Sequence, residues 1–197
     1  MKRELPPARE LAARLLPHLA VEETSTEKAN RSLTPSAVLV PLLDGESGPA
    51  LLFTRRSRSL PDHAGQIAFP GGVHDADDAD LRATALREAG EEVDVDPGRI
   101  EILGALERVS TLAKYRIQPF LALWPAGDYA PESLEEVERV FQVPLAWLAN
   151  PANETRVRVD LPGRRLDVPA WVWEGEVIWG ATRFITADLL ARLRLCP

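Results

Sequence analysis

The chain has 197 residues, 45% of them hydrophobic and 27% charged, a composition that favours one folded domain and excludes a transmembrane helix, a collagen-like repeat and a wholly disordered polypeptide. Its formal net charge of −7 disfavours binding to nucleic acid or to an anionic membrane surface. A single cysteine, Cys196, excludes an internal disulfide framework, and the first residues lack the unbroken apolar stretch of a signal peptide, so we expect a cytoplasmic protein.

The N-terminal half predicts a helix followed by the first strands of a sheet. Leucines at helical spacing indicate an amphipathic helix, and two apolar runs on either side of DGESG indicate a hairpin. We expect residues 1–33 to pack as a helix and loop on a domain of residues 34–197. The elements expected in this half are a helix at about 6–19, a loop at 21–33, strands at 36–43 and 49–55, a short strand entering a glycine loop within 65–72, and a helix at 77–93.

The C-terminal half predicts more strands than helices. Because strands and helices do not alternate regularly, we expect a mixed sheet flanked by helices, of the α/β (α+β) class, and not a doubly wound parallel fold. The expected strands are at 100–107, 116–124, 155–160, 166–173 and 176–179, and the expected helices are near 133–149 and 186–194.

The segment DADLRATALREAGEEV places three glutamates on one side of the predicted helix. Glu88 and Glu92 are one turn apart, where like charges oppose helix formation, and Glu91 and Glu92 lie near the C-terminus, where the helix dipole disfavours anions. Both penalties disappear if a divalent cation binds among the carboxylates. The alternative is a solvated acidic face, neutralised by Arg87 and by arginines elsewhere. On a helical wheel the buried stripe is Leu81, Ala85, Leu86, Ala89 and Val93, and the adjoining sector is Thr84, Glu88, Glu91 and Glu92.

The glycines upstream of this helix favour the metal. Gly71 and Gly72 allow bare backbone to approach phosphate oxygens or to offer a carbonyl to a metal. Oxygen ligands suit a hard cation, Mg²⁺ or Mn²⁺, and the arrangement is typical of metal-assisted attack of water on a phosphoanhydride. Aspartates at positions 75, 77, 78 and 80 supply an N-cap and a favourable charge at the start of the helix.

These residues resemble the box of the Nudix hydrolase family, which reads G, five residues, E, seven residues, R-E-U-x-E-E-x-G-U, where U is a bulky aliphatic residue. Arg87, Glu88, Glu91, Glu92 and Val95 match its second half, with Gly72 as the box glycine. The chain departs from the box in four ways: the interval from Gly72 to Arg87 is one residue longer, the intermediate Glu is missing with Asp80 its nearest substitute, Asp94 replaces the second glycine, and Ala89 fills the aliphatic position.

A second motif indicates one branch of that family. LLFTRRSRSLPDHAGQIAFPGG, residues 51–72, is similar to the motif that precedes the box in coenzyme A diphosphatases, and the resemblance extends over about 35–185. It implies a Nudix α/β/α sandwich with a mixed sheet. It also implies hydrolysis of coenzyme A or acyl-coenzyme A to 3′,5′-ADP and 4′-phosphopantetheine or its acylated form.

The resemblance implies roles for the acidic residues and for Arg87. Glu88 and Glu92 would be the leading metal ligands, with Glu91 as the third carboxylate beside Gly72, and Arg87 would orient the carboxylates. Glu136 is the candidate for a distant acid that completes the metal site or acts as base. Glu135 and Glu138 compete with it, and an exposed acidic helix start is the alternative for all three.

The upstream motif supplies the candidate substrate-binding residues. Arg55, Arg56 and Arg58 could contact the diphosphate or the 3′-phosphate, since a guanidinium makes bidentate, permanently charged contacts; a solvated strand end is the alternative. His63 could be a base, or could hold the glycine loop by a hydrogen bond. The candidate set is completed by Ser57 and Gly71.

Two rival functions stay open. Another Nudix specificity, for a dinucleotide or a nucleoside triphosphate, would use the same metal site. A catalytically silent nucleotide-binding module would explain the missing box Glu and Asp94, although the R-E-x-x-E-E core argues against it. The sequence leaves the oligomeric state open, a homo-oligomer included.

Overall fold

The computed structural model describes residues 5–20, 33–112, 114–161 and 164–194; Cys196 and most of the predicted loop at 21–33 lie outside these ranges. Three short 3₁₀ turns, η1 to η3, at Leu16–His18, Pro97–Arg99 and Pro151–Asn153, accompany the elements. The helices and strands are α1 (Ala8–Leu15), β1 (Thr34–Gly45), β2 (Gly48–Arg56), β3 (Ile67–Ala68), β4 (Gly71–Val73), α2 (Leu81–Glu92), β5 (Glu101–Ala105), β6 (Val109–Ser110), β7 (Tyr115–Leu123), β8 (Val137–Pro144), α3 (Leu145–Leu148), β9 (Glu154–Leu161), β10 (Arg164–Trp173), β11 (Glu176–Ile178) and α4 (Gly180–Leu193).

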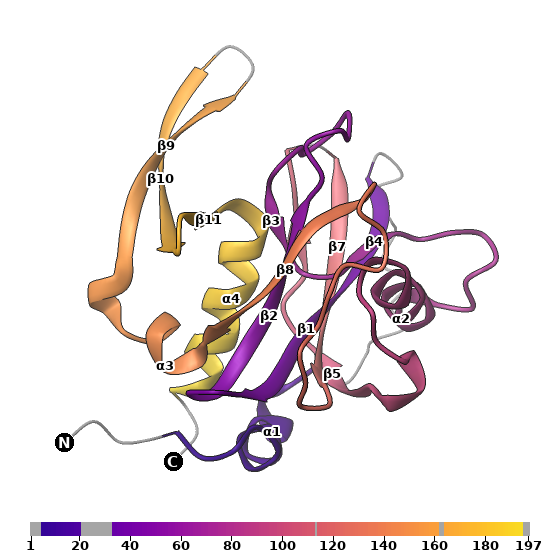
Figure 1. The fold of residues 1–197 in the computed structure, drawn as a ribbon, viewed down its shortest axis with the longest axis vertical. Helices are drawn as coiled ribbons and strands as arrows, with labels where there is room; N and C mark the ends of the chain where they lie inside the picture. The colour runs from indigo at the N-terminus through magenta and orange to yellow at the C-terminus, as the bar shows by residue number, and fades with distance from the viewer. Residues whose placement is uncertain (1–4, 21–32, 113, 162–163, 195–197) are drawn as a thin grey trace.

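A mixed sheet forms the centre of the molecule (Figure 1). Its strand order is β3-β2-β1-β7-β5, and β4, β6 and β8 pair with β1, β7 and β2 respectively. β1 and β7 run parallel, from Thr34 opposite Tyr115 to Leu42 opposite Leu123, whereas the other pairs are antiparallel. The predicted hairpin of two N-terminal strands and the mixed sheet are both confirmed.

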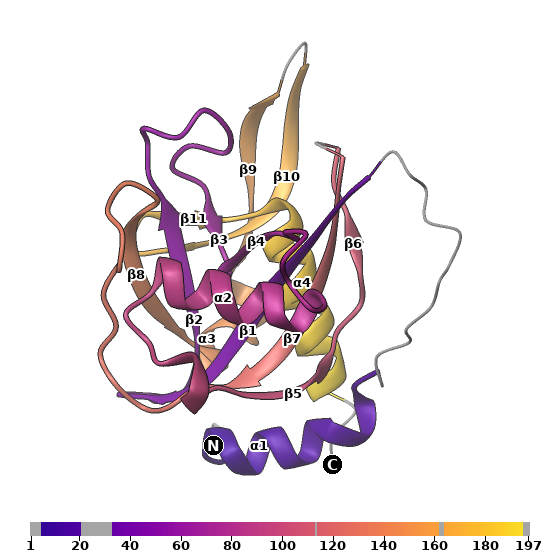
Figure 2. The same ribbon diagram turned by 90° about the vertical axis from the view of Figure 1, so that its right-hand side faces the viewer.

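Helices cover the two faces of this sheet, which makes the expected α/β/α sandwich (Figures 1 and 2). On one face Ala85 and Ala89 of α2 pack in a core cluster with residues of β1 and β7. On the other face a larger cluster contains residues of α1, α3 and α4, together with Trp171 and Ile178 of the second sheet. The chain therefore has a hydrophobic core on each side of the sheet, and α2 has one side free for chemistry. No helix in the described part of the chain is both long and apolar enough to cross a membrane.

One element was predicted wrongly. The expected helix at 133–149 is instead β8, which pairs with β2, followed by the four-residue α3. Val137, Phe141 and Val143 are buried and point to the same side of the strand, on which every second residue lies. The four-residue interval from Val137 to Phe141 also matches the spacing of one helix face, which explains the wrong prediction. The β-branched valines favour the strand. Two smaller differences are the start of α4 at Gly180 and the short strand β6, which no apolar run indicated.

A second sheet of β11, β10 and β9 lies beside α4 and extends beyond it as a two-stranded hairpin (Figures 1 and 2). Ion pairs join this sheet to the main sheet. Glu176 of β11 accepts hydrogen bonds from Arg55 of β2 (2.8 Å) and Arg139 of β8 (3.0 Å). Because the Glu176 side chain is nearly buried, this three-residue bridge fixes the second sheet against the end of β2.

Candidate active site

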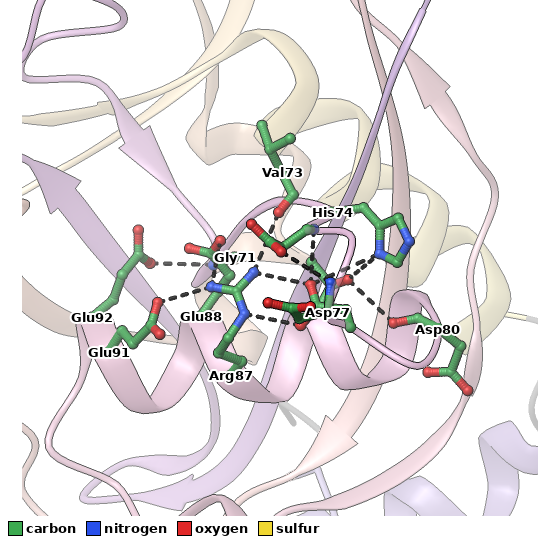
Figure 3. A network of polar contacts seen from close by, with 12 residues as sticks. Gly71, Val73, His74, Asp77, Asp80, Arg87, Glu88, Glu91 and Glu92 are labelled. Carbon is green, nitrogen blue, oxygen red and sulfur yellow. Dashed lines mark hydrogen bonds and ion pairs between the residues drawn. The ribbon is translucent and has the colours of Figure 1, made fainter.

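The carboxylates of α2 face the glycine strand β4 (Figure 3). β4 is hydrogen-bonded to β1 in the register Ser36 opposite Val73. At its first residue, the Gly71 N–H donates to Glu92 Oε2 at 3.2 Å. Asp80 caps the N-terminus of α2 by accepting from the Ala83 N–H at 2.8 Å. The predicted cap and helix are thus present, although the helix begins at Leu81, and the predicted glycine loop is instead the strand β4. The C-terminal turn of α2 lies against β4.

Glu92 is a buried carboxyl. Only 4% of its side chain is exposed, and this burial raises its pKa to about 8, although the Gly71 N–H and Arg56 both act to lower it. The wheel placed Glu92 beside the buried stripe, but neither Glu92 nor Thr84 of the same sector is on the surface. Thr84 resolves its burial by donating to the Asp80 carbonyl and by a 2.8 Å hydrogen bond with His74 Nδ1. Glu92 is less well compensated than Thr84. Its ion-pair partner, Arg56, approaches only to 3.7 Å, measured from Nη1 to the Glu92 Oε1.

Glu88 lies directly against Gly72. A Cβ added at Gly72 would lie 2.4 Å from the Glu88 carboxylate carbon. Glycine at this position therefore leaves room for the Glu88 side chain in the conformation that the structure shows. Burial raises the pKa of Glu88, against the opposing effect of Arg87. The box glycine is thus needed for space at the carboxylate.

Arg87 holds the acidic residues from the outer side of α2. It donates to Asp78 through two nitrogens, Nε to Oδ1 at 2.9 Å and Nη2 to Oδ2 at 3.0 Å. Its Nη1 lies 3.0 Å from Glu88 Oε1 and 2.9 Å from Glu91 Oε2, and Nη2 also donates to the Val73 carbonyl at 3.3 Å. The predicted orienting role of Arg87 therefore fits its contacts, because one guanidinium ties two of the three glutamates to the glycine loop.

Asp78 is the residue that the sequence analysis missed. Its hydrogen bonds from Arg87 hold its pKa well below its ordinary value, whereas Asp80, the nearest substitute proposed for the missing box Glu, caps the helix instead. The spacing contained the signal: Asp78 follows Gly72 after five residues, as the box Glu does. The extra residue of this chain therefore lies after Asp78, in the interval before Arg87.

Of the three candidate distant acids, the structure brings Glu136 toward the cluster. Burial is the main cause of the raised pKa of Glu88 and of Glu92, and the charge of Glu136 adds to both. Its backbone is anchored, since the Glu136 carbonyl accepts from the Ser57 N–H at 2.8 Å. Glu138 instead pairs with Arg55 at 3.2 Å, and Glu135 accepts a long hydrogen bond from Ser59 through its carbonyl. Ser57 thus positions the candidate acid through its backbone.

The three candidate arginines point in different directions. Arg56 faces Glu92, and its buried Nε has no hydrogen-bond partner among the described residues. Arg55 is engaged by Glu138 and Glu176 on the other face of β2. Arg58, with 77% of its side chain exposed, is 3.8 Å from Glu138. Arg56 is therefore the arginine that the structure brings to the carboxylates.

A pocket lies on the Arg55 side of the strand, beside the β2–β3 loop. Three arginines and two glutamates line it with the indole of Trp179, so its charges largely cancel. The lining residues are Arg55, Arg58, Gly65, Gln66, Arg139, Glu174, Gly175, Glu176, Val177 and Trp179.

His63 stays within its own loop. It has a left-handed backbone with φ of 57°, and its Nδ1 lies 3.0 Å from Gln66 Oε1. The Gln66 N–H in turn donates to the His63 carbonyl at 3.1 Å. These contacts match the loop-holding alternative, since they shape the turn that leads into β3.

The residues present fit a divalent metal. Glu88, Glu91 and Glu92 supply hard oxygen donors. The pKa values of Glu88 and Glu92 are raised, and a bound cation would lower both. In the described part of the chain no three acidic, histidine or cysteine side chains are arranged so that they could hold a metal ion; Glu88 and Glu91 are paired with Arg87 instead. Binding a cation therefore needs rotation of these side chains, with the backbone at Gly72 and α2 already in place.

The sequence of this chain is similar to proteins of one family. The NUDIX domain model matches residues 33–160. The uncharacterized Nudix hydrolase NudL of Photorhabdus laumondii is 36% identical over 160 residues, which cover 81% of this chain and 85% of that protein. A protein of the same name from an Enterobacter species is 35% identical over 82% of this chain and 84% of its own. Among solved structures, the NUDIX domain of Shewanella oneidensis NrtR with ADP ribose has a TM-score of 0.49 and 23% identity, over 62% of this chain and 80% of that one.

Proposed function

This chain belongs to the NUDIX family and is a hydrolase of that family, and from this premise we propose that it hydrolyses the diphosphate bond of coenzyme A or acyl-coenzyme A. The products are 3′,5′-ADP and 4′-phosphopantetheine or its acylated form. The observation that carries the proposal is the meeting of two motifs: Arg56, from the motif similar to coenzyme A diphosphatases, faces Glu92 of the carboxylate cluster.

Glu88, Glu91 and Glu92 would hold Mg²⁺ or Mn²⁺ beside Gly72. When bound, the cation supplies neutralising charge on the diphosphate and lowers the pKa of a coordinated water. Arg87 keeps the glutamates on one side of the helix through its hydrogen bonds. Asp78 holds Arg87 by two hydrogen bonds, so that the guanidinium does not compete with the metal for the glutamates.

Glu136 is the group that we assign to accept a proton from the attacking water. It is exposed, close enough to influence Glu88 and Glu92 electrostatically, and outside the Arg87 hydrogen-bond network. A carboxylate that is not itself consumed by metal binding can take this role.

The arginines divide the substrate between them. Arg56, with an unpaired buried Nε, contacts the diphosphate. Arg58, the most exposed, contacts the 3′-phosphate that distinguishes coenzyme A from dephospho-coenzyme A. Arg55 stays with Glu138 and Glu176 and maintains the end of β2. The pocket beside them, with its indole and its nearly balanced charges, suits the neutral adenosine part of the substrate.

The test compares coenzyme A, dephospho-coenzyme A, ADP-ribose, a diadenosine polyphosphate and a nucleoside triphosphate, with Mg²⁺ and separation of products. Coenzyme A should give the highest kcat/KM and release 3′,5′-ADP. Hydrolysis of only the other substrates would overturn the coenzyme A assignment but leave the diphosphatase activity. No hydrolysis of any of them would favour the silent binding module.

Three single variants test the division of roles. Arg58→Ala should remove a preference for coenzyme A over dephospho-coenzyme A of about 10- to 150-fold, since a charge-assisted contact is worth roughly 1.5 to 3 kcal/mol. Arg56→Ala should lower kcat/KM for both substrates equally. Arg55→Ala should lower the melting temperature and leave the ratio of kcat/KM for coenzyme A over dephospho-coenzyme A nearly unchanged. An unchanged ratio in Arg58→Ala would contradict the 3′-phosphate contact.

A further inference from the structure

The outer end of the hairpin of β9 and β10 projects away from the rest of the molecule (Figures 1 and 2). We call residues 156–160 and 165–168 the arm. The strand β9 is an edge: in the described residues it pairs with β10 and with no other strand. The arm is therefore a two-stranded ribbon with a free row of backbone N–H and C=O groups along one side.

One face of the arm is apolar and, among the described residues, lies outside both core clusters. Val157, Val159, Leu166 and Val168 share this face, because Val159 is opposite Leu166 and Val157 is opposite Val168. All four are half-buried, yet none belongs to or packs against either core cluster. An isolated two-stranded ribbon is at best marginally stable in water, and an unpaired edge with an apolar face is a template for another strand.

The other face of the arm carries charges of both signs. Arg158 Nε lies 3.1 Å from Asp167 Oδ1 on the neighbouring strand. Asp160 Oδ1 lies 2.7 Å from Arg165 Nε in the next pair on the same face. On β9 itself, Arg158 and Asp160 thus present one positive and one negative side chain, two positions apart, with Arg156 next to Arg158 on the same face.

This pattern is complementary to itself. We propose that β9 is the interface at which two copies of this chain form a symmetric dimer, with the two β9 strands antiparallel across a two-fold axis at Val159. In this register Arg158 lies opposite the partner's Asp160, and the reverse pair forms by symmetry. The charged face then reads Asp167, Arg158, the partner's Asp160 and the partner's Arg165 across four strands, with opposite signs at each step.

The apolar face supports the same register. Val159 lies opposite the partner's Val159, and each has Leu166 on its other side. A continuous row of Leu, Val, Val and Leu therefore crosses the joined sheet. The two three-stranded sheets become one six-stranded sheet, which removes the free edge of both copies.

Neighbouring registers are less favourable. An axis at Arg158 would place Arg156 against the partner's Asp160, but it would also place Arg158 against the partner's Arg158 at the centre of the interface. An axis at Val157 would place Arg156 against the partner's Arg158, and Glu154 against the partner's Asp160. Like charges directly opposite each other destabilise a strand pair, so among these three registers only the axis at Val159 avoids them.

The test uses two double variants that keep each arm internally paired. Arg158→Asp with Asp167→Arg reverses one ion pair of the arm, and Asp160→Arg with Arg165→Asp reverses the other. Each variant alone would put like charges across the two-fold axis. Mixed in equal amounts, the two variants present opposite charges to each other at both positions of the interface.

The mass in solution is measured by light scattering and by sedimentation at several protein concentrations. The natural chain should have about twice its 21.7 kDa mass, each double variant should have the mass of one chain, and the mixture should regain the double mass. Arg9→Glu with Glu101→Arg, which reverses an exposed ion pair on α1 and β5, should stay dimeric. Amide hydrogen exchange along β9 should be slow in the dimeric samples and fast in the single-chain ones.

A natural chain that stays at the mass of one chain throughout the micromolar range would overturn the proposal. So would double variants that remain dimeric by themselves, because the interface would then lie elsewhere. A mixture without recovery would also overturn it, provided that circular dichroism shows each variant folded. None of these readings depends on the substrate.

Discussion

At the scale of single residues, burial of the ionised Glu92 carboxylate in the active site is electrostatically unfavourable. The burial of this carboxyl raises its pKa to about 8, and the opposing effects of the Gly71 N–H and of Arg56, 3.7 Å away, do not offset it. The ordinary pKa of a glutamate is 4.5. The folded protein without metal therefore binds a proton at Glu92 more tightly than the unfolded chain does.

Replacing Glu92 changes how the stability of the metal-free protein depends on pH. A raised folded pKa gives a contribution that is fully present below pH 4.5 and is lost as the pH rises through about 8. In chelator, the melting temperature of the natural protein should fall over this window, and Glu92→Gln should flatten the fall and be the more stable form at pH 9. Thermal unfolding from pH 5 to 9 measures this, with the exposed Glu91→Gln as control. Parallel curves for the natural protein and Glu92→Gln would contradict the buried acid.

A second residue-scale prediction concerns Asp78, which acts on the reaction only through Arg87. Asp78→Asn removes the charge that holds Arg87 by two hydrogen bonds, so the guanidinium should move further toward the glutamates and compete with the metal. We expect kcat at saturating Mg²⁺ to fall by about 10- to 100-fold and the metal affinity to weaken, with little change in KM for the substrate. The matched control is Asp77→Asn, one residue away and exposed. Equal kcat in both variants would show that Asp78 serves the loop alone.

At the scale of elements, the sequence predicted α2, its cap and the hairpin of β1 and β2 well, since each has a local signal. Turn residues, a capping aspartate and apolar residues at one period are enough for these elements. β8 had no such signal, because its buried residues also fit a helix and its pairing with β2 depends on residues more than eighty positions earlier. Glu88, Glu91 and Glu92 all lie on α2, as expected, but the burial of Glu92 was not predicted. Burial of Glu92 depends on β4, which reaches α2 only through its pairing with β1.

The two glycines of β4 should respond differently to alanine. Gly71 has φ of 149°, and an added Cβ would lie 2.3 Å from the Ala37 carbonyl oxygen of the core strand β1, so Gly71→Ala should lower the melting temperature because backbone must move. At Gly72 the added Cβ meets the end of the Glu88 side chain, which can rotate away. Gly72→Ala should therefore keep its stability and lose activity. Thermal unfolding together with kcat separates the two, and a stability loss as large in Gly72→Ala as in Gly71→Ala would contradict this.

At the scale of the whole molecule, an acidic protein acts on an anionic substrate. The net charge of −7 repels a diphosphate, so the proposed function needs local attraction, which the arginines at the end of β2 and a cation bound by the glutamates of α2 would supply. The bridge of Arg55, Glu176 and Arg139 joins both sheets behind this point. The second sheet therefore supports the substrate side of the site without contributing a carboxylate to the metal.

Metal binding should consequently be visible in global stability as well as in activity. Chelator should abolish turnover, and Mg²⁺ should raise the melting temperature, because binding to the folded state alone at a hundredfold excess over Kd stabilises it by about 2.7 kcal/mol. The double variant Glu88→Gln with Glu92→Gln should lose both responses and lower kcat by on the order of 10² or more. Turnover at the natural rate in excess chelator would contradict the metal assignment.

The parallel pairing of β1 with β7 also determines when during folding the enzyme can become active. Thr34 and Tyr115 are neighbours in space, yet the whole glycine loop and α2 lie between them along the chain. Strands that meet across such a separation close slowly, because the entropy of the intervening chain is lost before any contact compensates it. α2 rests on a core shared by β1 and β7, so the glutamates reach their positions only after this closure. During refolding, activity should therefore return no earlier than the slowest recovery of native structure.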